Sequence, residues 1–380
     1  MNNWNKVKLG HVSTLQFGYA YKSEQFIANE IPVIRIGDIT ENGLIPDYNC
    51  CYSKDFWEKH PELQLHENSI LIAMSGATVG KSCLNNRKEK LLLNQRVTSV
   101  IATEKAITNY LLYAIKSDSF KSYVLKASMG CAQPNISGKQ ISDFQIPLPP
   151  IETQKQIAAT LDKVTKIISE NKKLLEKYDL LIKSRFIEMF GDNKYPIISI
   201  SEMVEGKVPS AKKLFNKTDE IKYIDISSVD NKINEIVGYT EYIFEEAPSR
   251  AQQHIRKNDI LISTVRPNLK NIAINRLDYK EMVASSGFCV LRPKCVPEYL
   301  FVAVLQDKFT SDMVAVTTGA NYPAIKDSDV LNYEISNPPL ELQQQFAAFV
   351  QQIDKSKFVV QKSLEKAETL YKSLMQEYFG

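Results

Sequence analysis

The chain has 380 residues, of which 44% are hydrophobic, and a formal net charge of +3. This length exceeds a typical single domain, and the apolar content is sufficient for well-packed cores. No apolar run reaches the roughly 18 residues of a membrane span, and the N-terminus lacks the apolar stretch of a signal peptide. We therefore expect a soluble, cytoplasmic protein. The small net charge neither supports nor excludes nucleic-acid binding, because local basic clusters can supply the phosphate contacts.

Residues 1–150 are predicted to form a first globular α/β unit. Arg35 lies within one apolar, strand-like run, and a second apolar run at 70–74 is predicted to be a strand. The second run leads into Ser75-Gly-Ala-Thr-Val-Gly80-Lys81-Ser82, which is similar to a phosphate-binding loop, except that Ser75 stands where the motif requires glycine. ATP binding is therefore not expected, although the backbone N–H groups of this loop and Lys81 could contact a phosphate of a nucleic acid.

Residues 151–191 are predicted to form a long helix. The stretch follows Pro149-Pro150 and contains no proline or glycine before its terminal Phe-Gly, and Glu152 lies in the first turn, where a carboxylate favours the helix dipole. At 1.5 Å per residue, such a helix extends over roughly 60 Å. Apolar side chains recur in alternating steps of four and three residues, the heptad pattern of a coiled coil. The predicted seam contains Ile157, Leu161, Val164, Ile168, Leu175, Tyr178 and Ile182.

Residues 192–339 and 340–380 repeat this arrangement as a second globular unit and a second long helix. The second seam contains Phe346, Val350, Ile353, Val360, Leu364, Tyr371 and Leu374. Asn171 and Lys357 interrupt the two seams, and polar residues at such positions often fix the register of a coiled coil. We expect the two helices to pair with each other in antiparallel orientation. The alternative is that each helix packs only on its own globular unit.

The two halves are related by a tandem duplication. Residues 130–191 align without a gap with residues 319–380, and the segments at 34–36 and 68–72 have counterparts at 224–226 and 258–262. Most loop residues of the globular units differ between the copies. This pattern predicts an α+β protein with two globular α/β domains in pseudo-twofold arrangement, separated by two long helices that form an antiparallel coiled coil. It also predicts one scaffold adapted to two different ligands.

Two further patterns that could indicate an enzyme do not hold. The six cysteines include no CxxC pair and no Cys/His spacing suited to zinc, so we expect buried or idle thiols and no metal site. Asn337-Pro338-Pro339-Leu340 resembles the motif that holds the flipped base in amino-methyltransferases, but leucine replaces the stacking aromatic residue. No glycine-rich S-adenosylmethionine loop follows any strand. No catalytic residues are therefore predicted.

Several segments resemble the specificity subunits (HsdS) of type I restriction-modification systems. The resemblance lies in the sequence from Gly130 through Pro149-Pro150 to Ile157, in its second copy from Gly319 to Gln345, and in the opening segments 7–10 and 17–23. The loop at 75–81 and Asn94-Gln-Arg-Val97 are also similar to that family. The resemblance covers essentially the whole chain. The second helix lead-in departs from the family pattern, because Ser336-Asn337 replaces the usual Pro-Leu.

The resemblance implies a non-catalytic subunit that recognises a split, asymmetric site in double-stranded DNA. Target-recognition domains at 1–150 and 192–339 would each contact one half-site, and the helices at 151–191 and 340–380 would set the spacer. Two methyltransferase (HsdM-type) subunits would dock on the helices, and translocase-nuclease (HsdR-type) subunits would complete the complex. These partners would carry S-adenosylmethionine, ATP and magnesium, so this chain is expected to need no cofactor of its own.

Base and phosphate contacts require cationic or hydrogen-bonding side chains on loops or helix ends. The candidates in the first domain are Lys22, Ser23, Arg35, Ser75, Thr78, Lys81, Asn94, Gln95 and Arg96. Those in the second are Lys212, Lys213, Ser227, Ser228, Arg250, Arg256, Arg266, Asn268 and Lys270.

Two alternative functions remain open at this stage. The chain could be a duplicated coiled-coil scaffold that binds protein or RNA, or the recognition part of a fused restriction or methylation enzyme. Intrinsic methylation by the isolated chain would favour the enzyme, and binding without preference for a split duplex site would favour the scaffold.

Overall fold

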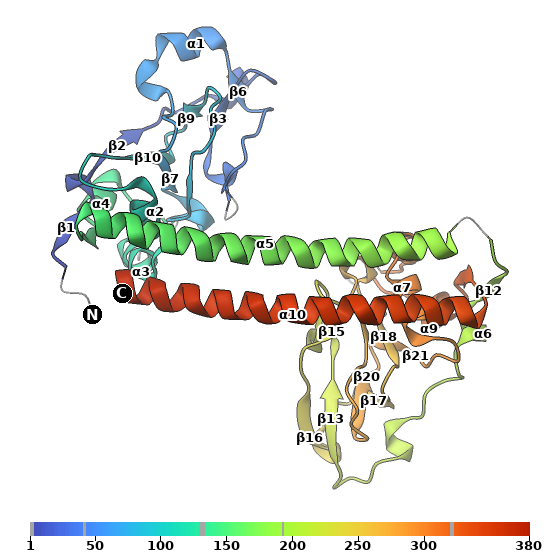
Figure 1. The fold of residues 1–380 in the computed structure, drawn as a ribbon. Helices are drawn as coiled ribbons and strands as arrows, with labels where there is room; N and C mark the ends of the chain where they lie inside the picture. Colours follow the sequence, from blue (N-terminus) through green and yellow to red (C-terminus); the bar gives the residue numbers. More distant parts are fainter. Residues whose placement is uncertain (1–3, 41–42, 129–133, 192–193, 320–322) are drawn as a thin grey trace. The chain divides into compact units, whose positions relative to one another are not determined.

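The computed structural model describes residues 4–40, 43–128, 134–191, 194–319 and 323–380. The chain divides into two compact units (Figure 1). Unit 1 consists of Met1–Lys172 and Lys362–Gly380, and unit 2 of Lys173–Gln361. The division therefore passes through both long helices, so that each unit contains one globular domain and part of each helix. Two residues of the sequence analysis lie outside the described residues. They are Cys131, one of the six cysteines, and Asp192, the expected first residue of the second domain.

The predicted mixture of helices and sheets in two similar copies is confirmed. In unit 1, a four-stranded antiparallel sheet has the order β2-β10-β7-β8, and a three-stranded sheet has the order β6-β3-β9. A two-stranded sheet pairs β1 with β11 and so joins the start of the domain to its end. The strands are β1 Lys6–Lys8, β2 Ser13–Phe17, β3 Ile31–Ile34, β4 Ile39–Thr40, β5 Gly43–Leu44, β6 Cys51–Tyr52, β7 Ile70–Ala73, β8 Ser82–Leu84, β9 Leu92–Leu93, β10 Val97–Ala102 and β11 Gln145–Pro147. The helices of the domain are α1 Lys54–Lys59, α2 Thr108–Lys116, α3 Asp118–Ala127 and α4 Gly138–Asp143.

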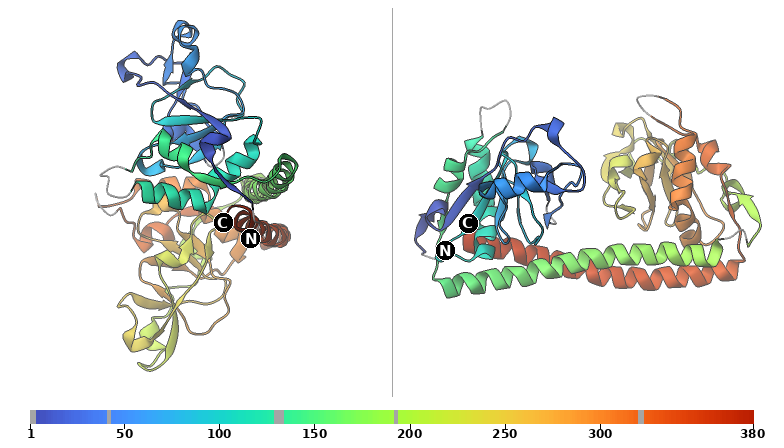
Figure 2. Two further views of the ribbon diagram at one scale, coloured as in Figure 1. Left: turned by 90° about the vertical axis from the view of Figure 1, so that its left-hand side faces the viewer. Right: turned by 90° about the horizontal axis from the view of Figure 1, so that it is seen from above.

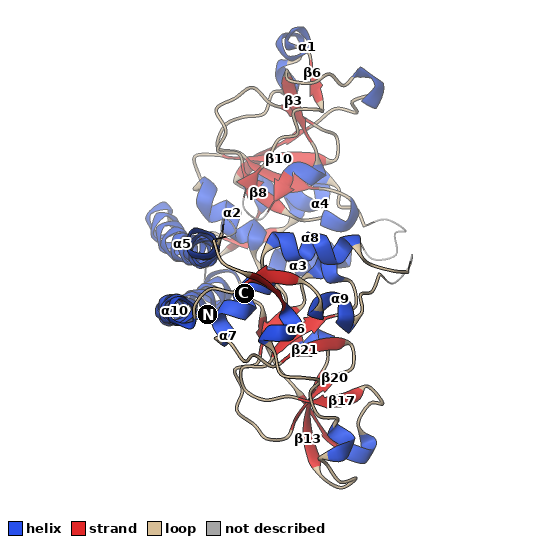
Figure 3. Ribbon diagram, turned by 90° about the vertical axis from the view of Figure 1, so that its right-hand side faces the viewer, coloured by secondary structure: helices blue, strands red, loops and turns tan. Residues whose placement is uncertain are grey.

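Unit 2 repeats this plan (Figure 3), but the sheet with β13, the counterpart of β3, has four strands, and the sheet with β18, the counterpart of β7, has three. Its sheets have the orders β16-β13-β20-β17 and β19-β18-β21, and β12 pairs with β22 as β1 does with β11. The strands are β12 Ile197–Ser199, β13 Glu220–Ile224, β14 Val229–Asp230, β15 Glu235–Ile236, β16 Thr240–Ile243, β17 Ala251–His254, β18 Ile260–Ser263, β19 Ile272–Ile274, β20 Met282–Ser285, β21 Phe288–Leu291 and β22 Glu334–Ser336. The helices of the domain are α6 Ile200–Met203, α7 Pro297–Val304, α8 Asp307–Ala315 and α9 Asp327–Leu331.

The long helices are α5, Ile151–Phe190, and α10, Leu340–Phe379, each of 40 residues. Within each unit they lie side by side and antiparallel (Figures 1 and 2). In unit 1, Asn171 Nδ2 donates to Ser363 Oγ at 3.0 Å. In unit 2, Lys357 Nζ donates to Asp179 Oδ1 at 2.7 Å. Both polar seam residues therefore bond to the opposite helix, as expected of groups that set register.

The predicted seam residues all avoid full exposure. Ile157, Leu161, Val164, Ile182, Phe346, Val350, Ile353 and Leu364 are buried, whereas Ile168, Leu175, Tyr178, Val360, Tyr371 and Leu374 are half-buried. Those near the helix ends belong to cores shared with the globular domains: Ile157, Leu161, Tyr371 and Leu374 in unit 1, and Tyr178, Ile182, Phe346, Val350 and Ile353 in unit 2. In unit 1 the start of α5 and the end of α10 pack with α2 and α3. Helix pairing and packing on the domains, which were alternatives in the sequence, thus occur together.

Two buried glutamines attach the helices to their domains. Gln154 Oε1 accepts from the N–H of Ile107 at 3.0 Å, and its Nε2 donates to the carbonyls of Pro149 and Lys105. Gln343 Oε1 accepts from the N–H of Val296 at 3.1 Å, and its Nε2 donates to Pro338 O at 2.9 Å. Gln154 and Gln343 are equivalent residues of the repeat. Both copies therefore hold the first turn of the long helix on its domain with the same kind of side-chain hydrogen bonds.

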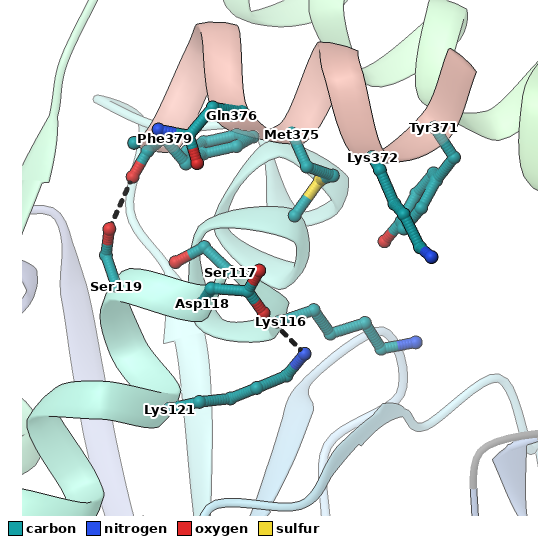
Figure 4. A pocket seen from close by; sticks show the side chains of 11 residues that line it. Lys116, Ser117, Asp118, Ser119, Lys121, Tyr371, Lys372, Met375, Gln376 and Phe379 are labelled. Carbon is teal, nitrogen blue, oxygen red and sulfur yellow. Dashed lines mark hydrogen bonds and ion pairs between the residues drawn. The ribbon is translucent and has the colours of Figure 1, made fainter. Parts of the chain in front are cut away.

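The end of α10 is fastened to α3 in unit 1. Ser119 Oγ donates to Phe379 O at 2.7 Å, as the dashed line in Figure 4 marks. This bond lies beside a cavity of about 470 Å³. Lys116, Lys121 and Lys372 line this cavity, and Lys121 is paired with Asp118 at 2.9 Å. The contact places the C-terminal helix end against the first globular domain.

Candidate nucleic-acid interface

Three chain segments meet at the end of β7 in unit 1. The N–H of Met74 donates to Arg96 O at 2.8 Å, and the N–H of Ile136 donates to Met74 O at 2.9 Å. The N–H of Gly76 donates to Pro134 O at 3.0 Å. These bonds hold together loops that are far apart in the sequence. We call the assembly the three-loop junction of unit 1, formed by residues 74–81, 94–96 and 134–137.

Unit 2 contains an equivalent junction at the end of β18. The N–H of Thr264 donates to Gly287 O at 2.9 Å, and the N–H of Ile325 donates to Thr264 O at 2.9 Å. The N–H of Arg266 donates to Pro323 O at 2.7 Å. The hydrogen-bond pattern is therefore the same in both copies, although the loop sequences differ. The three-loop junction of unit 2 consists of residues 264–271, 285–287 and 323–326.

The first loop of each junction is closed across its base by the same backbone bond. The N–H of Ala73 donates to Lys81 O, and the N–H of Ser263 donates to Asn271 O, both at 2.9 Å. Between these points each loop contains a short 3-10 turn, η5 Gly76–Thr78 in unit 1 and η9 Pro267–Leu269 in unit 2. Loops that project from strand ends on a rigid scaffold are common positions for binding residues.

The junction of unit 1 is concave and contains unsatisfied hydroxyl groups. A cavity of about 400 Å³ is lined by Met74, Ser75, Gln95, Arg96, Asn135, Ile136 and Ser137. The hydroxyls of Ser75 and Thr78 are buried and have no hydrogen-bond partner within the described part of the chain. A buried hydroxyl without a partner is costly, so these two groups are exceptions to the usual pairing of buried polar atoms. The polar side chains that line the cavity, among them Gln95, Arg96 and Asn135, are of the kind that contact bases and phosphates.

The junction of unit 2 is more strongly supported by side chains. Asn231 Nδ2 donates to Leu269 O at 2.7 Å, and Asn234 Nδ2 donates to Ile272 O at 3.1 Å. Lys270 Nζ is ion-paired with Asp307 in the first turn of α8. The hydrogen bond from Lys270 holds the pKa of the Asp307 carboxyl below its ordinary value. The first loop of unit 2 is consequently anchored on both sides.

Two residues of the unit 2 loop have an uncommon backbone conformation. Arg266 has φ 51° and Lys270 has φ 53°, both in the left-handed region. For residues other than glycine this conformation costs roughly 1–2 kcal/mol. The equivalent positions in unit 1 are Gly76, with φ 79°, and Gly80, with φ 80°. The two loops therefore share their backbone shape, and only the first has glycine at the strained positions.

The structure brings half of the predicted DNA-binding residues into the two junctions. Gln95, Arg96, Arg266 and Asn268 are exposed there, and Asn94 is engaged in the turn because its Oδ1 accepts from the N–H of Arg96 at 3.0 Å. The predicted residues within the junctions are Ser75, Thr78, Lys81, Asn94, Gln95, Arg96, Arg266, Asn268 and Lys270.

The other predicted residues lie away from the junctions or have local partners. Arg35 Nη2 donates to Asp47 Oδ2 at 2.7 Å, and the hydroxyls of Ser227 and Ser228 both donate to Asp225. Arg256 lies before the first residue of β18, at the opposite end of that strand from the junction. The remaining residues are exposed: Lys22 and Ser23 at η2, and Lys212 and Lys213 in η6. Arg250 is also exposed but borders the junction of unit 2, because its carbonyl accepts from the N–H of Ser286 at 2.8 Å.

Sequence reasoning missed the third segment of each junction. Pro134, Asn135 and Ser137 in unit 1 and Pro323 in unit 2 were not among the candidates. A signal was present, because the Gly-to-Pro spacing before these segments recurs in both copies. Among the described residues, no group of three or more His, Cys, Asp or Glu is arranged to bind a metal ion. The same residues include no helix that is long and apolar enough to cross a membrane.

Comparison with known proteins identifies what the two copies are similar to. The family model described as "Type I restriction modification DNA specificity domain" matches the chain twice, at residues 1–177 and 193–368. The MjaIX specificity subunit of a type I restriction enzyme from Methanocaldococcus jannaschii is 21% identical over 379 residues, which cover 92% of this chain and 86% of that protein. The MjaVIII specificity subunit from the same organism is 28% identical over 182 residues, and the match covers 47% of this chain and 43% of that protein.

A solved structure has the same fold over the whole chain. The S subunit of a type I restriction-modification system from M. genitalium matches with a TM-score of 0.63 at 14% identity. The match covers 100% of this chain and 98% of that one. At this identity the likeness concerns the fold alone.

Proposed function

Since this chain belongs to the family of type I restriction-modification specificity subunits and contains two specificity domains, we propose that it selects a split, asymmetric site in double-stranded DNA. Each globular domain contacts one half-site of a few base pairs. The chain supplies recognition, and the chemistry is carried by partner subunits. The contacts to DNA are made chiefly by the two three-loop junctions.

The matched junctions are the observation that carries this proposal. Two loops with one hydrogen-bond framework and different side chains are suited to two ligands that share a backbone and differ in sequence, which is how two half-sites differ. Phosphates and sugars are the same in every duplex, whereas the base edges in the major groove distinguish one sequence from another. The exposed polar residues on the junctions are of the types that make such contacts.

The long helices are proposed to set the unspecified spacer between the half-sites and to dock two methyltransferase subunits of the HsdM type. Their length and the duplicated attachment through Gln154 and Gln343 support this role. S-adenosylmethionine is proposed to bind the methyltransferase subunits. ATP and magnesium are proposed to bind translocase-nuclease (HsdR-type) subunits in the full complex. The site of action is proposed to be the cytoplasm, where the DNA substrate is found.

The proposal is tested by methylation-sensitive sequencing of host DNA with and without this gene. We expect deletion to abolish one split adenine-methylated motif and complementation to restore it. The motif would directly define both half-sites and the spacer. An unchanged methylome, together with no co-purifying methyltransferase, would contradict the proposal. The scaffold alternative predicts binding without preference for a split duplex, and the fused-enzyme alternative predicts methylation by the isolated chain.

A double variant tests the assignment of the second junction. Replacing Arg266 and Lys270 together with alanine is expected to impair recognition of the second half-site while the first remains specific. The structure adds a second reason for this effect, because Lys270 anchors the loop to Asp307. Equal loss of specificity in both half-sites would contradict the assignment.

A further inference from the structure

The tips of the two first loops differ between the junctions. In unit 2 the tip is Asn268-Leu269, and both side chains are exposed, that of Leu269 to 42%. The equivalent residues in unit 1 are Thr78 and Val79, which are half-buried, and Val79 packs against the core of that unit. The shared backbone framework therefore turns the side chains of its tip inward in unit 1 and outward in unit 2.

The outward tip of unit 2 is fixed on both sides. Pro267, the residue before it, is buried. The carbonyl of Leu269 accepts from Asn231 Nδ2 at 2.7 Å, and Lys270, the residue after it, is ion-paired with Asp307 on α8. A loop that is held in this way presents its side chains in one orientation, as a binding site requires. The exposed leucine is thus a fixed feature of the binding surface.

The chemistry of the two side chains points to base edges. Neither side chain carries the positive charge that neutralises a phosphate. The carboxamide of asparagine donates and accepts, and it pairs in bidentate fashion with N6 and N7 of adenine. Leucine offers only apolar atoms, and the apolar group that base edges present in the major groove is the C5-methyl of thymine. The two neighbouring residues therefore match the two bases of an A·T pair.

We propose that Asn268 and Leu269 are specificity-determining residues of the second domain. Asn268 contacts an adenine of the half-site, and Leu269 contacts a thymine methyl in the same base pair or the next one. This inference rests on the proposed function, because it requires that the chain direct methylation to a split motif. It gives unit 2 a contact that the inward tip of unit 1 does not make, as expected where two half-sites differ in sequence.

The first experiment compares methylomes of host cells that carry the full-length gene, wild type or variant, alongside the native partner genes. We expect Asn268→Ala to relax one A·T position of one half-site, with discrimination falling about 5- to 150-fold, the range for one bidentate pair. Leu269→Ala should relax an A·T position at most one base step away. The other half-site and the spacer should stay unchanged.

Matched variants separate a base contact from a structural role. Leu269→Met keeps an apolar side chain of similar volume and should retain the motif. Asn332→Ala removes an exposed asparagine at the C-terminal end of α9, and Val314→Ala shortens an exposed valine in the last turn of α8. Both control positions lie outside the junction, so every base of the motif should be retained. Melting temperatures of the purified chains establish that each variant is folded.

A binding assay tests the contacts at the level of single atoms. The full-length chain, co-purified with its partner subunits, is titrated with duplexes that contain the split motif. Uracil in place of the thymine removes only the C5-methyl, and 7-deazaadenine in place of the adenine removes N7. Both duplexes should bind the wild-type complex more weakly. Uracil should not weaken binding of Leu269→Ala further, and 7-deazaadenine should not weaken that of Asn268→Ala, because one partner of each contact is already gone.

The outcomes distinguish the inference from the function beneath it. A wild-type gene that directs no split motif overturns both. A motif that persists at every base in the Asn268→Ala and Leu269→Ala strains overturns the inference alone, and so does equal relaxation of both half-sites. Uniformly weaker methylation without relaxation at any base would mean that the tip contacts the DNA backbone or supports the domain, and would likewise overturn the inference.

Discussion

The glutamine that fastens each long helix to its domain allows a quantitative test of how the recognition units are held. Gln343 is 3% exposed and bonds to two backbone groups, the N–H of Val296 and the carbonyl of Pro338. Replacing Gln343 with leucine leaves the half-buried N–H of Val296 unpaired, which costs about 1–3 kcal/mol, and removes a second bond worth about 1 kcal/mol. The apolar surface of leucine returns about 1 kcal/mol. We expect a net destabilisation of about 2 kcal/mol.

The equivalent Gln154→Leu should be costlier by about 1 kcal/mol, because Gln154 donates to two carbonyls instead of one. Because a chain of two units need not unfold in one step, urea denaturation should be combined with hydrogen exchange resolved by peptide. Gln343→Leu should speed exchange in unit 2, and Gln154→Leu should do so in unit 1. Gln156→Leu and Gln345→Leu, at exposed positions of the same helix turns, serve as controls. Gln343→Leu behaving like Gln345→Leu, or both units loosening equally, would refute the reasoning.

Three further outcomes are expected from the described contacts. Burial raises the pKa of Cys83 to about 11 and that of Cys289 to about 12. Both thiols should therefore resist labelling by maleimide at neutral pH until the chain is unfolded. Mass spectrometry of the native protein after labelling checks this prediction. Asn275→Ala removes an amide that is 0% exposed and bonds to two backbone groups, and should lower the free energy of unfolding of unit 2 by about 2–3 kcal/mol in urea titration. Lys357→Leu removes a partly exposed ion pair with Asp179 that is worth about 0–1 kcal/mol, and it adds an apolar side chain to the seam between the helices. The melting temperature of the variant should therefore rise. A lower melting temperature would show that the ion pair stabilises the helices more than the added apolar contact does.

The long helices illustrate how far periodicity alone can be trusted. The heptad positions from Ile157 to Leu374 were identifiable because the spacing of apolar residues along a helix is a local property, and it determines which face is buried. The two-copy arrangement was equally evident from aligned residues at a constant offset. Even so, the sequence presented helix pairing and domain packing as alternatives. The structure shows both, since the same side chains form cores with the opposite helix and with α2, α3 and their counterparts.

The candidate interface was harder to predict from the sequence than the helices were. Composition pointed to Ser75, Arg96 and Arg266 as possible contacts, but Arg35 and Ser227 looked equally suitable, and the structure gives these two local carboxylate partners. Residue type does not reveal whether a polar side chain is already engaged, because the partner usually comes from another part of the chain. Pro134 and Pro323 escaped notice for the same reason, since their carbonyls accept bonds from loops more than fifty residues away in the sequence.

The amino-acid sequence by itself determined the duplication, the long helices with their seams, and the family to which both copies belong, because these depend on local periodicity and on similarity along the chain. Only the tertiary structure decided which loops meet at the two junctions and that Arg266 and Lys270 adopt the backbone of Gly76 and Gly80. Neither residue signals a left-handed conformation, which is imposed by hydrogen bonds from distant segments.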